Sequence, residues 1–463
     1  MGKYFILLVF NTLLYMGCPA TMNREYMILV FLSFILSVVL FFIEKDNAYI
    51  KNVYIRHSTL FVFVFFIVFY QRDLDYILGI LDGSESRIWI SPTIVVKSLI
   101  ISNIALNGFF IGYVYNKNRK REVFSKSNLK CRTYPNKRYL CFLAYFLFVL
   151  YLVVVDKSFL IGGYQEGRVD SNYQLVVIIQ AVLVATMTLY CIEYKESNSK
   201  KSIFQFFKYP FLLIILYSCI VVLSGRRTEV LRVVCILIIS LIYIKGTKLN
   251  YKRMAIFGLS LILAFALVGV LRGEDAKDLS SGMNEITQVE SISPFTAELS
   301  GSVNTLHVAV FNIPDQMPYN LGVSFFPSFA LLVPGLDRFL SQIIPSSIMI
   351  SSPEIITYLY WGGYDRPYGL GSSIVADVYV SFGILGVLII FIILGILFRY
   401  IEYSTFMKES SPYVVALSIC VFSQIIYACR TGVSVLFLGW TYSCILIYLI
   451  SGLKKTNNKC AKI

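Results

Sequence analysis

The stretch IVADVYVSFGILGVLIIFIILGILF, from Ile374 to Phe398, decides the fold, because Asp377 is the only charged residue in it. A helix needs about 20 predominantly apolar residues to cross the hydrocarbon core of a bilayer. The backbone polar groups of such a segment must bond to one another, since lipid offers them no partner. The stretch therefore predicts a membrane-spanning helix.

Similar apolar runs recur along the chain. The 463 residues are 57% hydrophobic and 16% aromatic, with a mean hydropathy of +0.71, which is more apolar surface than a soluble protein of this length can bury. The runs are long enough for helices rather than barrel strands, so we expect an all-α polytopic membrane protein. About twelve spans are predicted, at 4–20, 26–43, 57–71, 88–115, 138–155, 173–192, 207–223, 229–245, 254–271, 374–398, 412–429 and 431–452.

The basic residues predict the orientation of these spans. If the N-terminus is cytoplasmic, the inward segments carry 27 of the 41 Lys and Arg, whereas the outward segments carry 12. This asymmetry follows the positive-inside rule, and it places both termini in the cytoplasm. The bases lie in separate inward loops rather than in one stripe, so the net charge of +14 indicates contact with anionic lipid and not with nucleic acid.

One long segment, Gly273 to Ser373, interrupts the pattern of spans and falls on the outside. We expect three parts: spans one to nine in residues 1–272, a large periplasmic loop in 273–373, and the last three spans with a cytoplasmic tail in 374–463. The loop holds apolar pieces too short to span, such as Thr305–Ile313 and Pro327–Gly335. Such pieces suit interfacial or re-entrant helices.

Outward arginines form the first candidate site. In SGRRTEVLR, Arg226 and Arg227 lie where the eighth span begins. Adjacent guanidinium groups at a helix N-terminus offer several donors to an anion, and they oppose the helix dipole unless an anion joins them. Arg232 lies one turn deeper, where it either pairs with Glu229 or serves the site.

Further arginines lie at other outward helix ends. Arg272 ends the ninth span, Arg366 precedes the tenth, and Arg430 occupies the turn between the last two. Any one of them can be an interface anchor. Their common level at the membrane surface favours a shared phosphate-binding site.

Aromatic and acidic residues of the loop supply the other candidates. Tyr319, Trp361, Tyr364 and Tyr368 offer faces on which sugar rings stack, although an interfacial aromatic belt explains each ring equally well. His307 is the only outward histidine, and a lone histidine in an apolar run is more often packed than catalytic. The cysteines and carboxylates show no metal-ligand spacing, so we expect no metal.

At this point the residues resemble a family. In chain order, the features that carry the resemblance are the arginines where the eighth span begins, then Glu298 in TAELSGSVNTL. After these come the segments PYNLGVSFFPSFALLVPGLDRFL and GLGSSIVADVYVSFGILGVLIIFIILGIL. This pattern resembles the Wzy-type O-antigen and oligosaccharide repeat unit polymerases of bacteria. The family usually has Glu where this chain has Asp377, and often Asn where it has Ser381. The matching positions are Pro318, Tyr319, Gly322, Pro334, Ser372, Asp377, Tyr379, Phe382, Gly383 and Gly386.

The resemblance implies a GT-C-like membrane glycosyltransferase of the bacterial inner membrane. Such an enzyme joins undecaprenyl-diphosphate-linked oligosaccharide units at the periplasmic face and releases undecaprenyl diphosphate. The resemblance further implies a chain-length regulator as partner, no nucleotide sugar, no cofactor and no obligatory metal.

This chemistry assigns expected roles to the candidates. Arginines would bind the diphosphate and stabilise its charge as it leaves. A carboxylate near the acceptor hydroxyl would act as general base, with Glu298 first and His307 and Asp377 behind it. For the diphosphate, Arg226, Arg227 and Arg272 lead, followed by Arg366 and Arg430.

Two alternatives stay open from the sequence. An O-antigen ligase has a similar architecture and relies on a loop histidine, which His307 would supply. A flippase or secondary transporter also suits twelve spans, but polar groups should then line the middle of the membrane. In this sequence only Lys97 and Arg232 lie deep.

Overall fold

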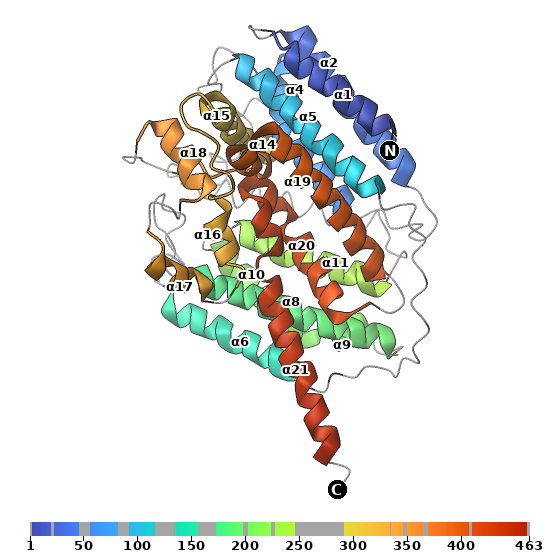
Figure 1. Cartoon of the computed structure of the whole chain (residues 1–463). Helices are drawn as coiled ribbons and strands as arrows, with labels where there is room; N and C mark the ends of the chain where they lie inside the picture. The colour runs from blue at the N-terminus through green and yellow to red at the C-terminus, as the bar shows by residue number, and fades with distance from the viewer. Residues whose placement is uncertain are drawn as a thin grey trace, which may run out of the picture.

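The computed structural model is all-helical in the part of the chain that it describes, with no strand there (Figure 1). The described residues are 2–19, 23–45, 56–81, 92–115, 134, 136–155, 173–197, 202–223, 227–245, 291–333, 335–345, 350–363, 369–406 and 410–460. Every predicted span except 254–271, which lies outside these ranges, overlaps an α-helix, although the α-helix in the last span, 431–452, begins only at Trp440.

The longer helices form the body of the protein. They are α1 (Gly2–Met16), α2 (Arg24–Lys45), α3 (His57–Phe69), α5 (Pro92–Tyr115), α6 (Lys137–Val154), α8 (Tyr173–Glu196), α10 (Lys208–Leu223), α11 (Arg227–Lys245), α19 (Ile374–Phe406), α20 (Pro412–Thr431) and α21 (Trp440–Cys460). Within the described ranges, seven segments are long and apolar enough to cross a membrane, and α1, α3 and most of α10 are shorter apolar helices. The prediction of a helical multi-pass protein is confirmed in this coarser form.

Short helices fill the segment between α11 and α19. They are α14 (Pro294–Ser300), the 3-10 helix η3 (Gly301–Val303), α15 (Asn304–Asn312), α16 (Phe325–Ala330), α17 (Leu336–Ile343) and α18 (Ser352–Trp361). Two further short helices lie elsewhere, α4 (Gln71–Ile77) and α9 (Ile203–Phe206), and the 3-10 helix η4 (Val433–Phe437) joins α20 to α21. The third predicted span, 57–71, was too long, because the helix ends at Phe69 and α4 begins separately at Gln71.

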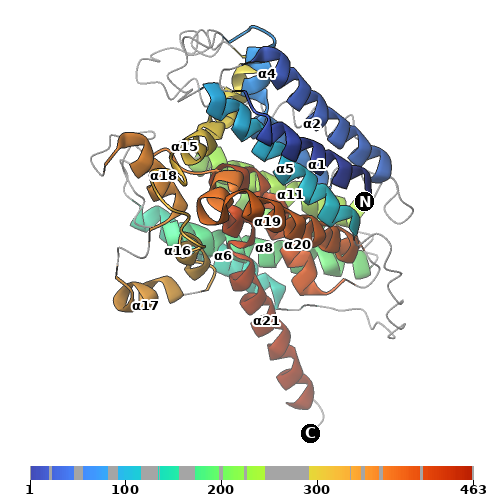
Figure 2. The same cartoon turned by 45° about the horizontal axis from the view of Figure 1, so that its top comes forward.

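Two hydrophobic cores divide the bundle, and α20 lies between them. One core draws on α1, α2, α3, α5, α15 and α19, and the other on α6, α8, α10 and α11. From α20, Val421 and Ile425 belong to the first core, whereas Ile419 and Phe422 belong to the second. Figures 1 and 2 show the corresponding groups, with the dark blue helices α1 and α2 lying beside the cyan helix α5, and α6 and α8 lying apart from them.

The contact between α5 and α19 depends on glycine. A Cβ added at Gly112 would clash with the backbone oxygen of Ile392, and one at Gly395 would clash with that of Phe109. A Cβ added at Gly108 would lie 2.9 Å from the backbone oxygen of Leu388. Only hydrogen fits at these positions, so the two backbones touch, as in small-residue packing between membrane helices.

A kink in α19 explains part of the sequence motif. Gly383 has φ 63° and ψ −159°, outside the helical region, so the carbonyls of the preceding turn lose their partners in the helix. The backbone N–H groups of Asn320 and Leu321 bond to the oxygens of Val380 and Ser381, at 3.2 and 3.0 Å. Pro318–Gly322 and Tyr379–Gly383, far apart in the sequence, therefore form one structural unit.

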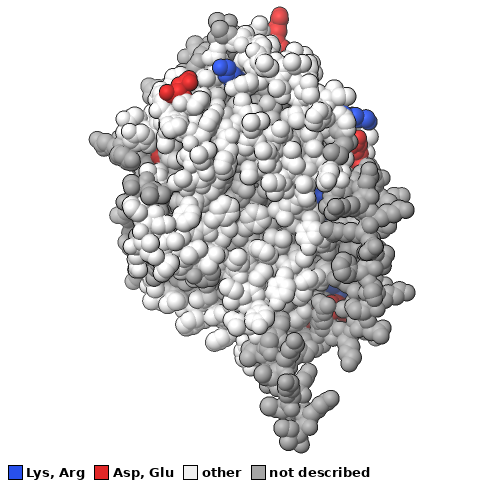
Figure 3. All heavy atoms as spheres, in the orientation of Figure 1, with Lys and Arg blue, Asp and Glu red and all other residues white. Residues whose placement is uncertain are grey.

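The outer surface of the bundle suits lipid. Phe142 of α6 and Leu385 of α19 are 72% and 74% exposed, and they have large apolar neighbours. In Figure 3 the blue and red residues lie near the upper edge and the right margin, while the centre of the face is uncharged. Such a broad apolar face is expected where acyl chains replace water.

Candidate functional site

The segment that carries Glu298 is anchored to α4. Asp75 accepts hydrogen bonds from the Ser291 hydroxyl at 2.7 Å and from the Ile292 backbone N–H at 2.8 Å. Gln71 bonds to the Ser293 carbonyl at 3.1 Å and accepts from the Thr296 hydroxyl at 2.6 Å. These bonds fix the start of α14, and Glu298 follows one turn after its first residue.

Asp377 ties three elements together at the start of α19. Its Oδ1 accepts a hydrogen bond of 2.5 Å from the Ser352 hydroxyl, at the start of α18. Its Oδ2 accepts one of 3.1 Å from the Val433 backbone N–H, at the start of η4. A Cβ at Gly432 would lie 2.5 Å from Oδ2, so this approach requires glycine.

Arg430 extends this junction to the segment after α14. Its Nε donates a hydrogen bond of 3.2 Å to the hydroxyl of Ser302 in η3. Because η3 directly follows α14, the end of α20 lies beside the helix that carries Glu298. Two sequence candidates therefore belong to neighbouring elements.

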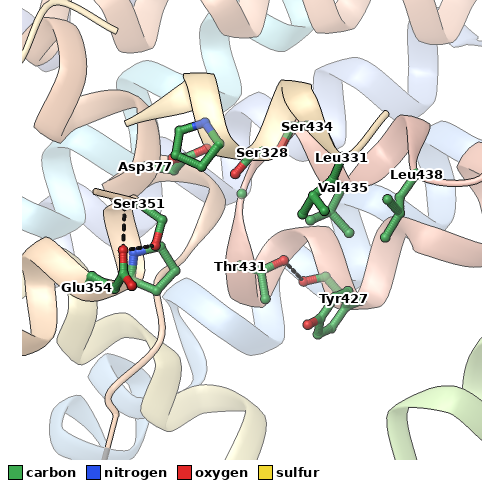
Figure 4. A pocket seen from close by; sticks show the side chains of 13 residues that line it. Ser328, Leu331, Ser351, Glu354, Asp377, Tyr427, Thr431, Ser434, Val435 and Leu438 are labelled. Atoms are coloured by element: carbon green, nitrogen blue, oxygen red, sulfur yellow. Dashed lines mark hydrogen bonds between the residues drawn. The ribbon is translucent and has the colours of Figure 1, made fainter. Parts of the chain in front are cut away.

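A pocket of about 370 Å³ opens at this junction (Figure 4). Polar groups face apolar ones across it, and among the described residues that line it none is basic. In Figure 4, Glu354 and Ser351 lie on one side, with Tyr427 and Thr431 across from them. The lining residues are Pro327, Ser328, Leu331, Ser351, Pro353, Glu354, Asp377, Tyr427, Thr431, Gly432, Ser434, Val435 and Leu438.

Arg232 lies behind the pocket as a buried charge. It is 1% exposed, it forms a 2.9 Å ion pair with Glu229, and Gln180 also bonds to Glu229. Its guanidinium carbon lies 3.9 Å from the centre of the Tyr427 ring, and Tyr427 lines the pocket. The sequence indicated the Glu229 pair as one of two options, and the structure adds the contact with Tyr427.

A second polar cluster lies between α4 and α15. His307 is 1% exposed, and burial together with the nearby Arg72 lowers its pKa to about 3. Asp73 is also 1% exposed, and neither of its carboxylate oxygens has a hydrogen-bond partner among the described residues. Burial raises the pKa of Asp73 well above its usual value, against the opposing effect of Arg72.

Sequence reasoning missed Asp73, because it lies in a short acidic run that looked like an ordinary outward turn. The signal available was RDLD directly after an apolar run, which puts carboxylates at the surface of the bundle. His307 was expected more often to be packed than catalytic, and it is packed. It does not line the pocket.

Of the predicted aromatic residues, the two that the structure describes, Tyr319 and Trp361, do not line the pocket. Tyr319 packs edge-on against Tyr379, with ring centres 6.0 Å apart, and it covers Gly383. Trp361 contacts Tyr360, with ring centres 5.0 Å apart, at the end of α18. Neither lines the pocket, whereas Tyr427, which the sequence did not single out, does.

Several predicted residues lie wholly or partly outside the described part of the chain. Arg227 begins α11 and Glu298 lies within α14, but their side chains are not described. Arg226, Arg272, Arg366, Tyr364 and Tyr368 lie outside the described residues.

Comparison with known proteins identifies a family. A family model described as O-antigen polysaccharide polymerase Wzy matches residues 3–459. No curated protein and no solved structure matches the chain. The matched range contains the spans, the short helices between α11 and α19, and the pocket.

Proposed function

Because the chain belongs to the O-antigen polysaccharide polymerase Wzy family, membrane glycosyltransferases that polymerise repeat units, we propose that it joins undecaprenyl-diphosphate-linked oligosaccharides at the periplasmic face of the inner membrane. The acceptor hydroxyl oxygen attacks the anomeric carbon of the growing chain, and the bond from that carbon to the phosphate oxygen breaks. Undecaprenyl diphosphate leaves, and the hydroxyl proton passes to a general base. The family match favours this reaction over the ligase and flippase alternatives.

The observation that carries the proposal is the junction at one end of the bundle. There the start of α19, the turn after α20, the start of α18 and the segment after α14 meet through Asp377 and Arg430. In the predicted topology all of these lie on the periplasmic side, where flipped lipid-linked units would be found.

Contacts between distant segments support the twelve-span topology. At the junction end, Asp75 bonds to Ser291 and Arg430 to Ser302. At the opposite end, the Ser58 N–H bonds to Glu402, and Tyr243 bonds to Ser410. With 254–271 as the ninth span and the N-terminus in the cytoplasm, each contact joins two segments on the same side.

We assign the diphosphate to the arginines rather than to the pocket. Arg226 and Arg227 at the start of α11, with Arg272, Arg366 and Arg430, would bind the leaving group. The pocket lacks basic lining residues in its described part, so it does not suit a diphosphate.

We keep Glu298 as the first choice for the general base. Asp377 already accepts hydrogen bonds on both oxygens, which suits a residue that holds α18 and η4 in place. His307 is buried away from the pocket, and its lowered pKa keeps it neutral. Glu298 lies in α14, beside the η3 segment to which Arg430 bonds.

A complementation experiment tests the proposal. In a strain lacking this gene, we expect lipopolysaccharide capped with a single repeat unit, and the wild-type chain should restore a ladder. Arg226→Ala, Arg227→Ala and Glu298→Gln should each fail to restore long chains at normal expression. Arg119→Ala, in a predicted inward loop, is the matched control and should restore them.

Two outcomes would contradict the proposal. Bare core without a repeat unit in the deletion strain would indicate a ligase. Full-length chains in all three variants would remove the assigned site residues.

A further inference from the structure

We infer that the pocket between α16, α18, α20 and η4 binds one uncharged pyranose residue of the lipid-linked unit. This inference rests on the proposed function, since it assigns a sugar subsite to the same junction. It adds which groups hold the sugar and which class of sugar they exclude.

The lining of the pocket suits a neutral polyol. Hydroxyls come from Ser328 and Ser434, and carboxylates from Glu354 and Asp377, while Leu331 belongs to the apolar lining. Sugar hydroxyls donate to carboxylates and exchange hydrogen bonds with side-chain hydroxyls, and the apolar groups cover the C–H faces of the ring. Such a mixture of few polar groups and apolar walls is typical of small-molecule sites.

The charge of the pocket excludes acidic ligands. Two of its lining residues are carboxylates, and none of the described ones is Lys, Arg or His. An acidic sugar, or the lipid diphosphate, would meet like charge without a counter-charge. The sugar and the diphosphate therefore occupy different places, the pocket and the arginines.

Glu354 supplies an acceptor oxygen that no described residue uses. Its Oε2 accepts from the backbone N–H and the hydroxyl of Ser351, at 2.8 and 2.9 Å, which closes a capping box at the start of α18. Its Oε1 has no hydrogen-bond partner among the described residues. The cap fixes the side chain, so Oε1 is held ready for a ligand hydroxyl without further ordering.

Tyr427 supplies a wall whose orientation is fixed from behind. Arg232 contacts the ring face at 3.9 Å, and Arg232 is itself held by Glu229 at 2.9 Å. Aromatic faces pack well against the C–H groups of sugar rings, and a ring held in one orientation loses little entropy on binding. Arg232 is in this sense a positioning residue, which explains why a charge is retained at so buried a place.

The volume of the pocket matches a small ligand. At about 370 Å³ it lies near the lower end of ligand pockets, which run from about 300 to 1,000 Å³. It is large enough for one ring of the oligosaccharide, and we assign the remaining rings to the space outside it.

Steady-state kinetics on the full-length protein test the inference. The protein is purified into lipid nanodiscs and supplied with lipid-linked repeat units extracted from a polymerase-deficient strain of the same bacterium. Ser328→Trp fills the pocket and should raise the KM at least about tenfold. Phe326→Trp, on the same short helix but outside the lining, is the matched control and should leave the KM unchanged.

Glu354→Gln separates charge from folding. Glutamine also closes a capping box, so α18 keeps its start, but the charge-assisted acceptor is lost. The KM should rise about threefold to tenfold while kcat changes little. The double variant Arg232→Met with Glu229→Gln leaves no buried charge unpaired and should likewise raise the KM, and comparison with Tyr427→Ala then shows whether Arg232 acts through the ring.

Competition by free sugars tests the ligand class. Methyl glycosides of the neutral sugars in the strain's own polysaccharide should inhibit the wild type, and methyl glucuronoside should not. An unchanged KM for Ser328→Trp, or stronger inhibition by the glucuronoside, would overturn the inference. A wild-type protein that makes no ladder would instead refute the proposed function, so the two failures are distinguishable.

Discussion

The interface between α5 and α19 and the interface between α11 and α20 bury their helices by opposite means. At the first, Gly108, Gly112 and Gly395 remove side chains so that backbones touch. At the second, Arg232 and Glu229 of α11 place a buried ion pair against Tyr427 of α20. Lipid gives helices no hydrophobic reason to associate, so close packing and polar contacts must determine the pairing.

The two interfaces therefore serve different purposes: the one between α5 and α19 holds the fold together, and the one between α11 and α20 adjoins the candidate site. Glycine packing gives a precise interface but contributes no chemistry. A buried ion pair costs desolvation energy and is weak evidence for stability, so its presence calls for another reason. The charged interface is the one that adjoins the pocket, which supports a functional reason for it.

The largest expected effect is at the glycine interface. Gly112→Leu would put side-chain atoms into the backbone of Ile392 and should destabilise the protein by more than about 3 kcal/mol, leaving little folded protein. Fluorescence size-exclusion of a tagged protein in detergent measures this. Gly301→Ala, where nothing lies within 4 Å, is the control, and equal loss in both variants would contradict close packing as the cause.

Breaking the ion pair should have the next largest effect. Arg232→Met leaves the Glu229 charge buried without its partner and should cost about 3–5 kcal/mol of stability. The double change Arg232→Met with Glu229→Gln should recover much of this loss, as measured by thermal unfolding in detergent. A double variant as unstable as the single one would show that packing, and not charge, holds α11 to α20.

A smaller effect is expected at the junction itself. Asp377→Asn replaces one accepting oxygen by a donating amide, so either Ser352 or Val433 loses its acceptor, at a cost of about 1–3 kcal/mol. Thermal unfolding measures the cost, and Asp315→Asn, at an exposed loop position, is the control. If both variants keep wild-type stability, Asp377 does not hold the elements together.

The smallest expected effect is the pH dependence of stability that comes from His307, in the polar cluster between α4 and α15. The folded state holds the pKa of His307 near 3, below the usual 6.5, so the unfolded chain binds a proton that the folded chain does not. Above pH 6.5 His307 is neutral in both states and does not reduce the free energy of unfolding. As the pH drops from 6.5 towards 3, protonation of the unfolded chain lowers this free energy, by about 1–2 kcal/mol at pH 5. His307→Gln should lose this part of the dependence between pH 7 and 5, and an unchanged profile would exclude His307 as its source.

Much of the fold could be predicted because lipid imposes it. The apolar runs of spanning length predicted the positions of the long helices. The predicted ends were wrong where an apolar run continues past a point at which the backbone leaves the helix. The third span shows this, since Tyr70 continues the apolar run of α3 while the backbone departs from the helix there. The glycine interface could not be predicted, because the clash that each glycine avoids belongs to a helix far away in the sequence.

The sequence predicted several residues of the candidate site, but it did not predict which elements these residues bring into contact. Charge patterns pointed to Arg430 and Asp377 separately, yet only the structure shows that they bond to neighbouring elements. The sequence did not single out Tyr427, because its distinguishing feature is a contact with the buried guanidinium group of Arg232 on another helix. Glu354 caps the start of α18, and only the structure shows that it also lines a pocket to which α16, α20 and η4 contribute.

The kink at Gly383 determines which parts of the molecule can move separately. Two backbone carbonyls of α19 accept hydrogen bonds from the N–H groups of Asn320 and Leu321, and each such bond contributes about 0.5–1.5 kcal/mol. We therefore expect the segment around Asn320 and the start of α19 to move together, and any hinge to lie outside this unit.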